Sequence, residues 1–147
     1  MLTSPDFRDL LKCLASHEVR YLVVGGYAVM KYTAPRFTKD LDLWISTDIK
    51  NAESVFAALM AFGAPLKGLT PADFSQEGFF YQMGRAPLRV DIMMSLTGVD
   101  FESAWRRLEK VVIQGIEVPF ISKADLIKSK KAAGRPQDLI DLGNLEL

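Results

Sequence analysis

The sequence predicts a single α/β domain (α+β), residues 1–147, in which helices flank a small mixed or mainly antiparallel sheet. Segments with apolar residues at helical spacing alternate with short apolar runs that end at glycine, proline or small polar residues. Short glycine-containing loops join two pairs of predicted strands, which indicates hairpins and argues against a doubly wound parallel sheet. With 49% hydrophobic residues, a chain of this length can bury one core.

The first half of the chain predicts helices and strands in the order helix 5–16, strand 20–24, helix 26–32, strand 40–45 and helix 49–62. Ser4-Pro5 is typical of a helix start, because a capping side chain precedes proline at the first helical position. Ser46-Thr47-Asp48 offers caps for the third helix, and Gly63 follows its last apolar residue, where glycine ends many helices.

The second half predicts two hairpins and three helices, in the order strand 78–83, strand 87–93, helix 100–108, strand 110–113, strand 116–121, helix 123–133 and a short helix from Pro136. Residues 64–77 are expected to form a loop with a helical turn after Thr70-Pro71. The hairpins are expected to turn at Gly84-Arg85-Ala86 and at Gln114-Gly115. Asp100 and Ser122 supply helix caps.

Two acidic residues, Asp40 and Asp42, interrupt the apolar pattern of the second predicted strand. Side chains alternate between the faces of a strand, so both carboxylates project from one face while Leu41 and Leu43 point into the core. Carboxylates held this close repel each other unless a cation lies between them. The pattern therefore predicts a site for Mg²⁺, or for Mn²⁺ as the alternative ion. The structural alternative is that Asp40 caps a turn and Asp42 faces solvent.

The Gly25-Gly26 pair follows an apolar strand and precedes a predicted helix. A turn without side chains lets backbone N–H groups approach a phosphate, and the helix N-terminus adds a favourable dipole. A tight turn without a ligand is the alternative. Asp91 is the one acidic residue in strand 87–93, where a buried acid must be paired, protonated or bound to a metal. Its partner is either a metal shared with the earlier acids or an arginine, Arg36 or Arg89.

The ordered set of strand, Gly25-Gly26, helix, Asp40-x-Asp42 and a later strand with Asp91 resembles the nucleotidyltransferase superfamily typified by DNA polymerase β. The resemblance implies the nucleotidyltransferase fold, with the glycine pair as the phosphate loop. It also implies that Asp40 and Asp42 bind the metals that carry a nucleoside triphosphate, and that Asp91 helps to hold the metal that activates the attacking hydroxyl. Many superfamily members have Gly-Ser here, and Gly-Gly lacks that hydroxyl, although active members with Gly-Gly exist.

The C-terminal region resembles more narrowly the tail of small bacterial nucleotidyltransferase-like proteins related to abortive-infection toxins of the AbiEii type. The pattern is a helix with a lysine, then Gly-Arg-Pro and Asp-x-x-Asp, matched here by Lys130, Arg135, Asp138 and Asp141. The resemblance implies that Lys130 and Asp138 take part in catalysis, with the lysine balancing triphosphate charge and the aspartate orienting the acceptor or acting as a base. It also implies a possible toxin role and an antitoxin partner.

Basic residues near these motifs are candidate ligands for phosphate. Arg36 and Lys39 precede the two aspartates and either contact the nucleotide or offset the local negative charge. Between Arg106 and Arg135, eight basic residues are opposed by three acidic ones in a chain whose net charge is zero. That local excess favours a tRNA or other RNA acceptor, with a protein or a small molecule as the alternatives.

These observations together predict a Mg²⁺-dependent enzyme that transfers a nucleoside monophosphate from a nucleoside triphosphate to an acceptor hydroxyl. The rival hypotheses are a non-catalytic nucleotide-binding or toxin–antitoxin component with the same fold, and a structural protein whose motif is coincidental. No apolar run approaches the ~20 residues that a membrane-spanning helix needs. One cysteine, Cys13, and the lack of a signal-peptide pattern fit a cytoplasmic protein. A single histidine, His17, argues against zinc sites of the His/Cys type.

Overall fold

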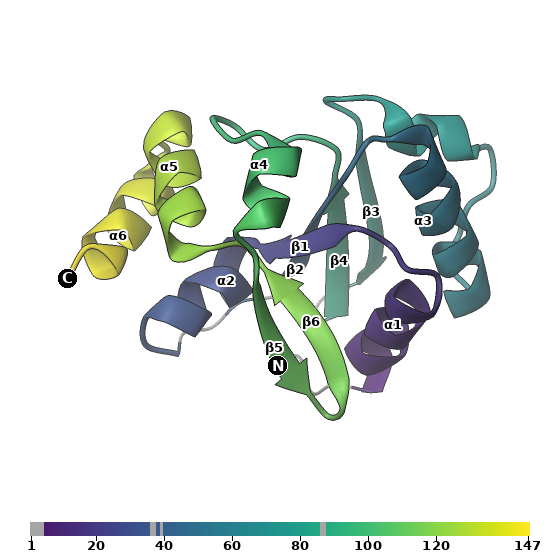
Figure 1. The fold of residues 1–147 in the computed structure, drawn as a ribbon, viewed down its shortest axis with the longest axis horizontal. Helices are drawn as coiled ribbons and strands as arrows, with labels where there is room; N and C mark the ends of the chain where they lie inside the picture. Colours follow the sequence, from purple (N-terminus) through teal and green to yellow (C-terminus); the bar gives the residue numbers. More distant parts are fainter. Residues whose placement is uncertain (1–4, 36–37, 39, 86–87) are drawn as a thin grey trace.

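The computed structural model describes residues 5–35, 38, 40–85 and 88–147 and shows a six-stranded mixed sheet with helices around it (Figure 1). The strands lie in the order β3-β4-β2-β1-β6-β5. The elements, in chain order, are α1 (Pro5–Ser16), β1 (Tyr21–Val24), α2 (Gly25–Tyr32), β2 (Asp40–Ile45), α3 (Ile49–Phe62), the 3₁₀ helix η1 (Pro71–Ser75), β3 (Phe80–Arg85), β4 (Leu88–Met93), α4 (Phe101–Arg106), β5 (Glu109–Ile113), β6 (Ile116–Phe120), α5 (Lys123–Ala133) and α6 (Pro136–Leu145).

The sheet is mixed because two of its pairings are parallel. β1 pairs with β6 and β2 with β4 in parallel, whereas β1–β2, β3–β4 and β5–β6 are antiparallel. The predicted fold class is therefore confirmed, including both hairpins. The parallel pairing of β2 with β4 sets the functional geometry, because it places the two acid-bearing strands side by side in register.

The predicted elements are all present, with changed boundaries. The expected loop at Gly84-Arg85-Ala86 is wrong in part, because Gly84 and Arg85 belong to β3 and pair with Arg89 and Leu88 of β4. Helix 100–108 is shorter than expected: it ends at Arg106, and Glu109 already pairs with Phe120 in the second hairpin. Ser4 and Ala86 lie outside the described residues.

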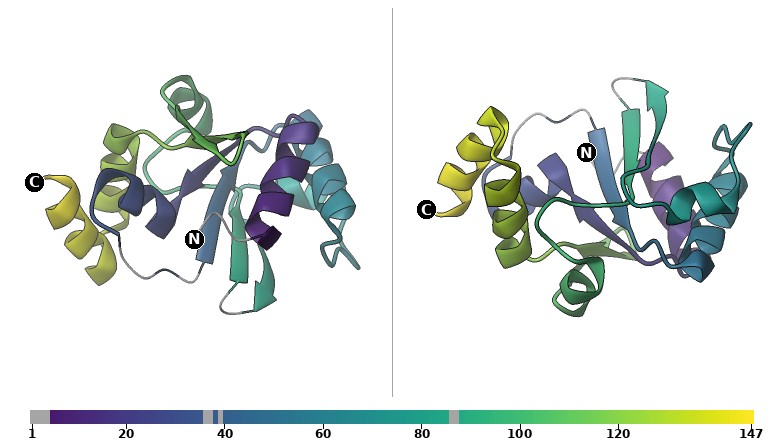
Figure 2. Two further views of the ribbon diagram at one scale, coloured as in Figure 1. Left: turned by 90° about the horizontal axis from the view of Figure 1, so that it is seen from below. Right: turned by 90° about the horizontal axis from the view of Figure 1, so that it is seen from above.

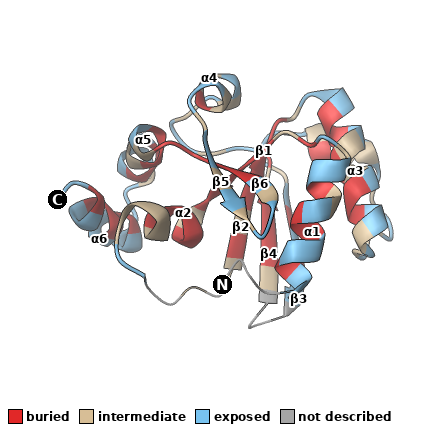
Figure 3. Cartoon of the chain, turned by 60° about the horizontal axis from the view of Figure 1, so that its bottom comes forward, coloured by how far each residue is buried: buried red, intermediate tan, exposed pale blue. Residues whose placement is uncertain are grey.

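The helices gather at the two ends of the sheet. α1 and α3 pack together at one end, and α2, α5 and α6 lie at the other in all three views (Figures 1 and 2). All four residues of β1 are buried, as are Leu41 and Leu43 of β2, so the central strands form the middle of the core (Figure 3). No helix in the described part of the chain is both long and apolar enough to cross a membrane.

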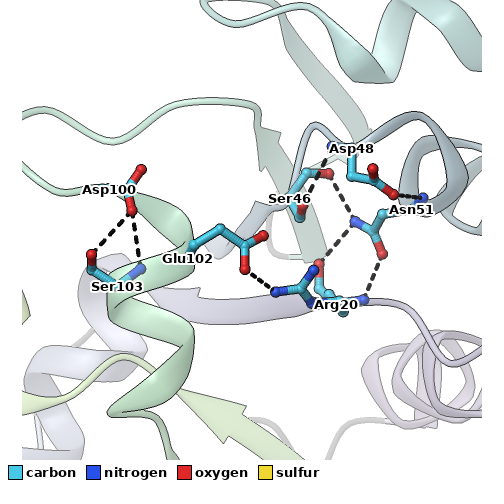
Figure 4. Close-up of polar contacts among 7 residues, drawn as sticks. All are labelled: Arg20, Ser46, Asp48, Asn51, Asp100, Glu102 and Ser103. Carbon is cyan, nitrogen blue, oxygen red and sulfur yellow. Dashed lines mark hydrogen bonds and ion pairs between the residues drawn. The ribbon is translucent and has the colours of Figure 1, made fainter.

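Asn51 of α3 fastens the ends of the central strands to this helix (Figure 4). Its side-chain oxygen accepts a hydrogen bond from the Arg20 amide, while its nitrogen donates to the carbonyl oxygens of Arg20 and Ser46. Asp48 caps the same helix by accepting from the Asn51 amide. A buried amide with three bonds to backbone groups fixes where β1 begins and β2 ends, and so helps to fix the registry of the strands that carry the acids.

Candidate active site

The structure brings the three acids Asp40, Asp42 and Asp91 together on one face of β2 and β4. In the parallel ladder, Asp42 lies opposite Asp91 and Asp40 opposite Arg89. Each of the three aspartates offers one carboxylate oxygen, and these oxygens all lie within 4.8 Å of one another. We call this group the carboxylate triad.

The electrostatics of the carboxylate triad fit a divalent cation. Burial, followed by the charge and hydrogen bond of Asp91 and the charge of Asp40, raises the pKa of Asp42 to about 7, against a smaller lowering effect of Lys130. A carboxyl group with so high a pKa is still partly protonated near neutrality, because it is buried and lies beside two further carboxylates. A hard cation with oxygen ligands removes that excess, so the donor set suits Mg²⁺ or Mn²⁺.

The glycine turn lies directly against Asp42. Gly25 has a φ of +68°, and a Cβ added there would lie 2.8 Å from Cγ and 2.9 Å from Cβ of Asp42. Only glycine combines this backbone conformation with this close approach. α2 begins at Gly25, one residue earlier than expected, and no side chain caps its N-terminus. The amides of its first turn therefore face the region beside Asp42 as potential phosphate donors.

Two further residues hold the triad in place: Gln82, which sequence analysis did not single out, and Arg89, which it named as an alternative partner of Asp91. Gln82 of β3 donates from Nε2 to Oδ1 of Asp91 over 2.8 Å. Arg89 of β4 donates from Nη2 to Oδ2 of Asp40 over 2.6 Å, and its Nε lies 3.7 Å from Oδ1 of Asp91. Period-two alternation was the available signal for Arg89, since it stands two residues before Asp91 in one strand.

A second charged cluster joins α5 to α6. Lys130 Nζ lies 3.2 Å from Oδ1 of Asp138 and 2.9 Å from Oδ2 of Asp141, and Arg135 Nε donates to Oδ2 of Asp138 over 2.8 Å. Both aspartates are fully buried. Burial alone raises the pKa of Asp138, but hydrogen bonds from Arg135 and Lys130 outweigh it and lower the pKa to about 2. The tail motif thus forms one compact ionic cluster with Lys130 at its centre.

A cavity of about 410 Å³ connects the carboxylate triad with this cluster. Its lining includes Gly25 and Asp42 on one side and Lys130, Arg135 and Asp138 on the other. Three residues with hydroxyl side chains, for which no sequence pattern indicated a site role, also line it: Ser95, Thr97 and Ser129. Of the predicted nucleotide ligands, Arg36 and Lys39 lie outside the described residues.

A model of the protein family described as "Nucleotidyltransferase of unknown function (DUF6036)" matches residues 7–147. The chain belongs to this family. The predicted superfamily is therefore confirmed, and the protein is a nucleotidyltransferase, an enzyme class whose donor is a nucleoside triphosphate. The narrower likeness to AbiEii-type toxins stays a prediction.

Several solved structures are similar in fold to this nucleotidyltransferase. The lincomycin-bound lincosamide antibiotic adenylyltransferase LnuA has a TM-score of 0.61 at 16% identity, over 97% of this chain and 96% of its own. The antibiotic-resistance factor ANT(2'')-Ia has a TM-score of 0.61 at 12% identity, over 95% and 80%. An antigenic nucleotidyltransferase-like protein from Paracoccidioides brasiliensis has a TM-score of 0.55 at 21% identity, over 92% and 71%. Among curated proteins, no sequence match is found.

Proposed function

We propose that this nucleotidyltransferase uses Mg²⁺ to transfer a nucleoside monophosphate from a nucleoside triphosphate to a hydroxyl group of a small-molecule acceptor. The observation that carries the proposal is the clustering of Asp40, Asp42 and Asp91 beside the uncapped N-terminus of α2. Three acids on two adjacent strands have no packing function. A metal-bound phosphate, in contrast, needs carboxylates that bind the metal next to free backbone amides that bind the phosphate.

In this proposal, different residues bind the metal and the triphosphate. Asp40, Asp42 and Asp91 would hold the divalent cation, while the amides of Gly25 and Gly26 would bind triphosphate oxygens. Bound there, the cation would neutralise phosphate charge and lower the pKa of an acceptor hydroxyl. Arg36 and Lys39 would contribute further positive charge to the nucleotide.

Lys130 and Asp138 have different roles in this proposal. A carboxyl group whose pKa is about 2 is a poor proton acceptor near neutrality, so we assign Asp138 the positioning of Lys130 and Arg135 instead of base catalysis. Lys130 remains the cation that faces the triphosphate side, since it lines the cavity together with Asp42.

The charge distribution favours a small acceptor over RNA. Five of the eight basic residues that suggested an RNA surface are engaged in ion pairs with acids, in the pairs Lys110–Glu117, Arg107–Asp125, Lys130–Asp141, Arg135–Asp138 and Lys131–Glu146. The cavity volume of about 410 Å³ is typical of sites for small molecules. The lincomycin-bound adenylyltransferase offers a precedent for a small-molecule ligand on this fold. An RNA or protein acceptor, a toxin role and an antitoxin partner rest on sequence resemblance and local charge alone.

Nucleotide binding tests the proposal first. Isothermal titration of each nucleoside triphosphate, with and without Mg²⁺, is expected to show binding that requires the ion in the wild type and is lost in Asp40→Asn/Asp42→Asn. Asp48→Asn is the matched control, because asparagine also caps a helix and Asp48 lies beyond the far end of β2. The control should bind as the wild type does.

Turnover tests the second half of the proposal. Incubation with nucleotide labelled at the α-phosphate and a panel of hydroxyl-bearing small molecules and RNAs should release pyrophosphate and label a small molecule. Mg²⁺-dependent binding without transfer to any acceptor would favour the nucleotide-binding module. Binding that survives in Asp40→Asn/Asp42→Asn would refute the proposed metal site.

A further inference from the structure

Arg89 lies between two members of the carboxylate triad. It stands opposite Asp40 in the ladder of β2 and β4 and two residues before Asp91 on the same face. Nη2 of Arg89 is 2.6 Å from Asp40 Oδ2, and Nε is 3.7 Å from Asp91 Oδ1. Within the part of the chain that the structure describes, these are the ion pairs made to the triad. Among the described residues, Arg89 is therefore the cation that forms ion pairs with the triad, while Lys130 acts on Asp42 through its charge.

The ion pairs of Arg89 differ in geometry from a bidentate arginine–aspartate pair elsewhere in the structure. Arg107 and Asp125 form a matched fork, in which Nε and Nη2 donate over 3.0 and 2.9 Å to the two oxygens of one carboxylate. Arg89 makes only one such bond, and its buried Nε has no hydrogen-bond acceptor among the described residues. Bidentate pairs are the strong ones, so a single-bonded guanidinium is the easier one to displace.

We propose that Arg89 is the counter-ion of the metal-free carboxylate triad, and that it competes with the incoming divalent cation for Asp40 and Asp91 and leaves them when that cation binds. The inference rests on the proposed metal site. A divalent ion brings twice the charge of a guanidinium to the same oxygens, and therefore wins this competition once it is concentrated enough. The Arg89 side chain is 40% exposed, so it can turn into solvent without unpacking the core.

This role makes Arg89 a positioning residue that sets the affinity of the site for metal. With Arg89 in place, the triad and arginine together carry two negative charges at full ionisation; without it they carry three. When no metal is present, the positive charge of the arginine also reduces the repulsion between the carboxylates. Removing it should therefore lower the stability of the metal-free protein and raise its affinity for the cation.

Arg89→Gln separates these effects from catalysis. Isothermal titration with Mn²⁺ alone is expected to give a Kd roughly tenfold lower in the variant than in the wild type, from the loss of one charge a few ångströms away at an effective dielectric constant of about 20, reduced by solvent exposure. The melting temperature without metal should fall. Arg107→Gln is the matched control: it also breaks an arginine–aspartate pair, and should lower the melting temperature without changing the Kd for Mn²⁺.

The outcomes distinguish this inference from the proposed function. Equal or weaker Mn²⁺ binding in Arg89→Gln, with binding retained in the wild type, overturns the role of Arg89 and leaves the metal site standing. No binding in either protein overturns both. Binding by the variant alone supports an arginine that blocks the site.

A second measurement uses the unaltered protein and so does not depend on the variant folding. In ¹H–¹⁵N spectra of the arginine Nε–H groups, Mg²⁺ should shift the Arg89 signal along the same titration curve as binding, because its surroundings change from carboxylate to solvent. The Arg107 signal should stay in place as the internal reference. An Arg89 signal that Mg²⁺ leaves unmoved while binding occurs would also overturn the inference.

Discussion

Gly25→Ala tests whether the glycine turn and Asp42 form one site. Alanine at a φ of +68° costs about 1–2 kcal/mol, because the left-handed conformation brings Cβ close to the backbone. The new Cβ would also lie 2.8–2.9 Å from Cγ and Cβ of Asp42, and Cβ moves only with the backbone of β2. Relief of such crowding costs about 1–3 kcal/mol. The total loss is therefore on the order of 2–5 kcal/mol, which is within the stability of most domains.

Gly63→Ala provides the control for this prediction. Gly63 has a φ of +94° at the end of α3, but a Cβ there would meet nothing within 4 Å. Only the conformational cost applies, so we expect a loss of about 1–2 kcal/mol. Urea unfolding gives both free energies, and melting with and without Mg²⁺ reports the site. Gly25→Ala should lose the Mg²⁺-induced increase in melting temperature although all three acids remain. If it keeps that increase and is no less stable than Gly63→Ala, the coupling between turn and triad is refuted.

Three further predictions concern stability. The pKa of Asp42 is raised to about 7 in the folded protein, against an ordinary value of 3.8. The proton bound to Asp42 therefore stabilises the fold fully below pH 4, and this stabilisation is lost as the pH rises towards 7. Melting curves without metal should show the decline in the wild type and not in Asp42→Asn. Asn51→Ala should lower the free energy of unfolding by about 3 kcal/mol in urea titrations, because three backbone groups lose their partner, and a loss below about 1 kcal/mol would contradict the fastening role. Lys130→Met should cost about 3 kcal/mol because it leaves Asp141 buried without this cation, and Lys130→Met/Asp141→Leu should recover part of that loss if the cost is electrostatic.

The fold was predictable because the local signals agreed with one another. Period-two alternation put Asp40 and Asp42 on one face, and the cap at Asp48 with glycine at Gly63 gave α3 its limits. Apart from the two hairpins, the pairing partners of the strands were not predictable in this way. Residues 40–45 and 88–93 are separated by α3, η1 and β3, and local sequence carries no signal for a parallel ladder between them.

The charges of the C-terminal region show a second limit of prediction from sequence. Between Arg106 and Arg135 the sequence has an excess of basic residues, which suggested a surface for RNA. Two of the acids that pair with them, Glu117 and Asp125, lie inside that window, but Asp138, Asp141 and Glu146 come from beyond it and pair with Lys130, Lys131 and Arg135. A charge count along the chain misses such partners because the pairing is tertiary.

The site's parts follow one another along the chain in an order that matters for its synthesis. The carboxylate triad is complete once residue 91 has been made, but α5 and α6, which wall the cavity, are the last elements to emerge, and β6 must first take its place beside β1. A nascent or prematurely terminated chain therefore carries the acids without Lys130 and Arg135. Such a fragment lacks the walls of the cavity beside Asp42, so the complete site forms only after the last two helices have been made.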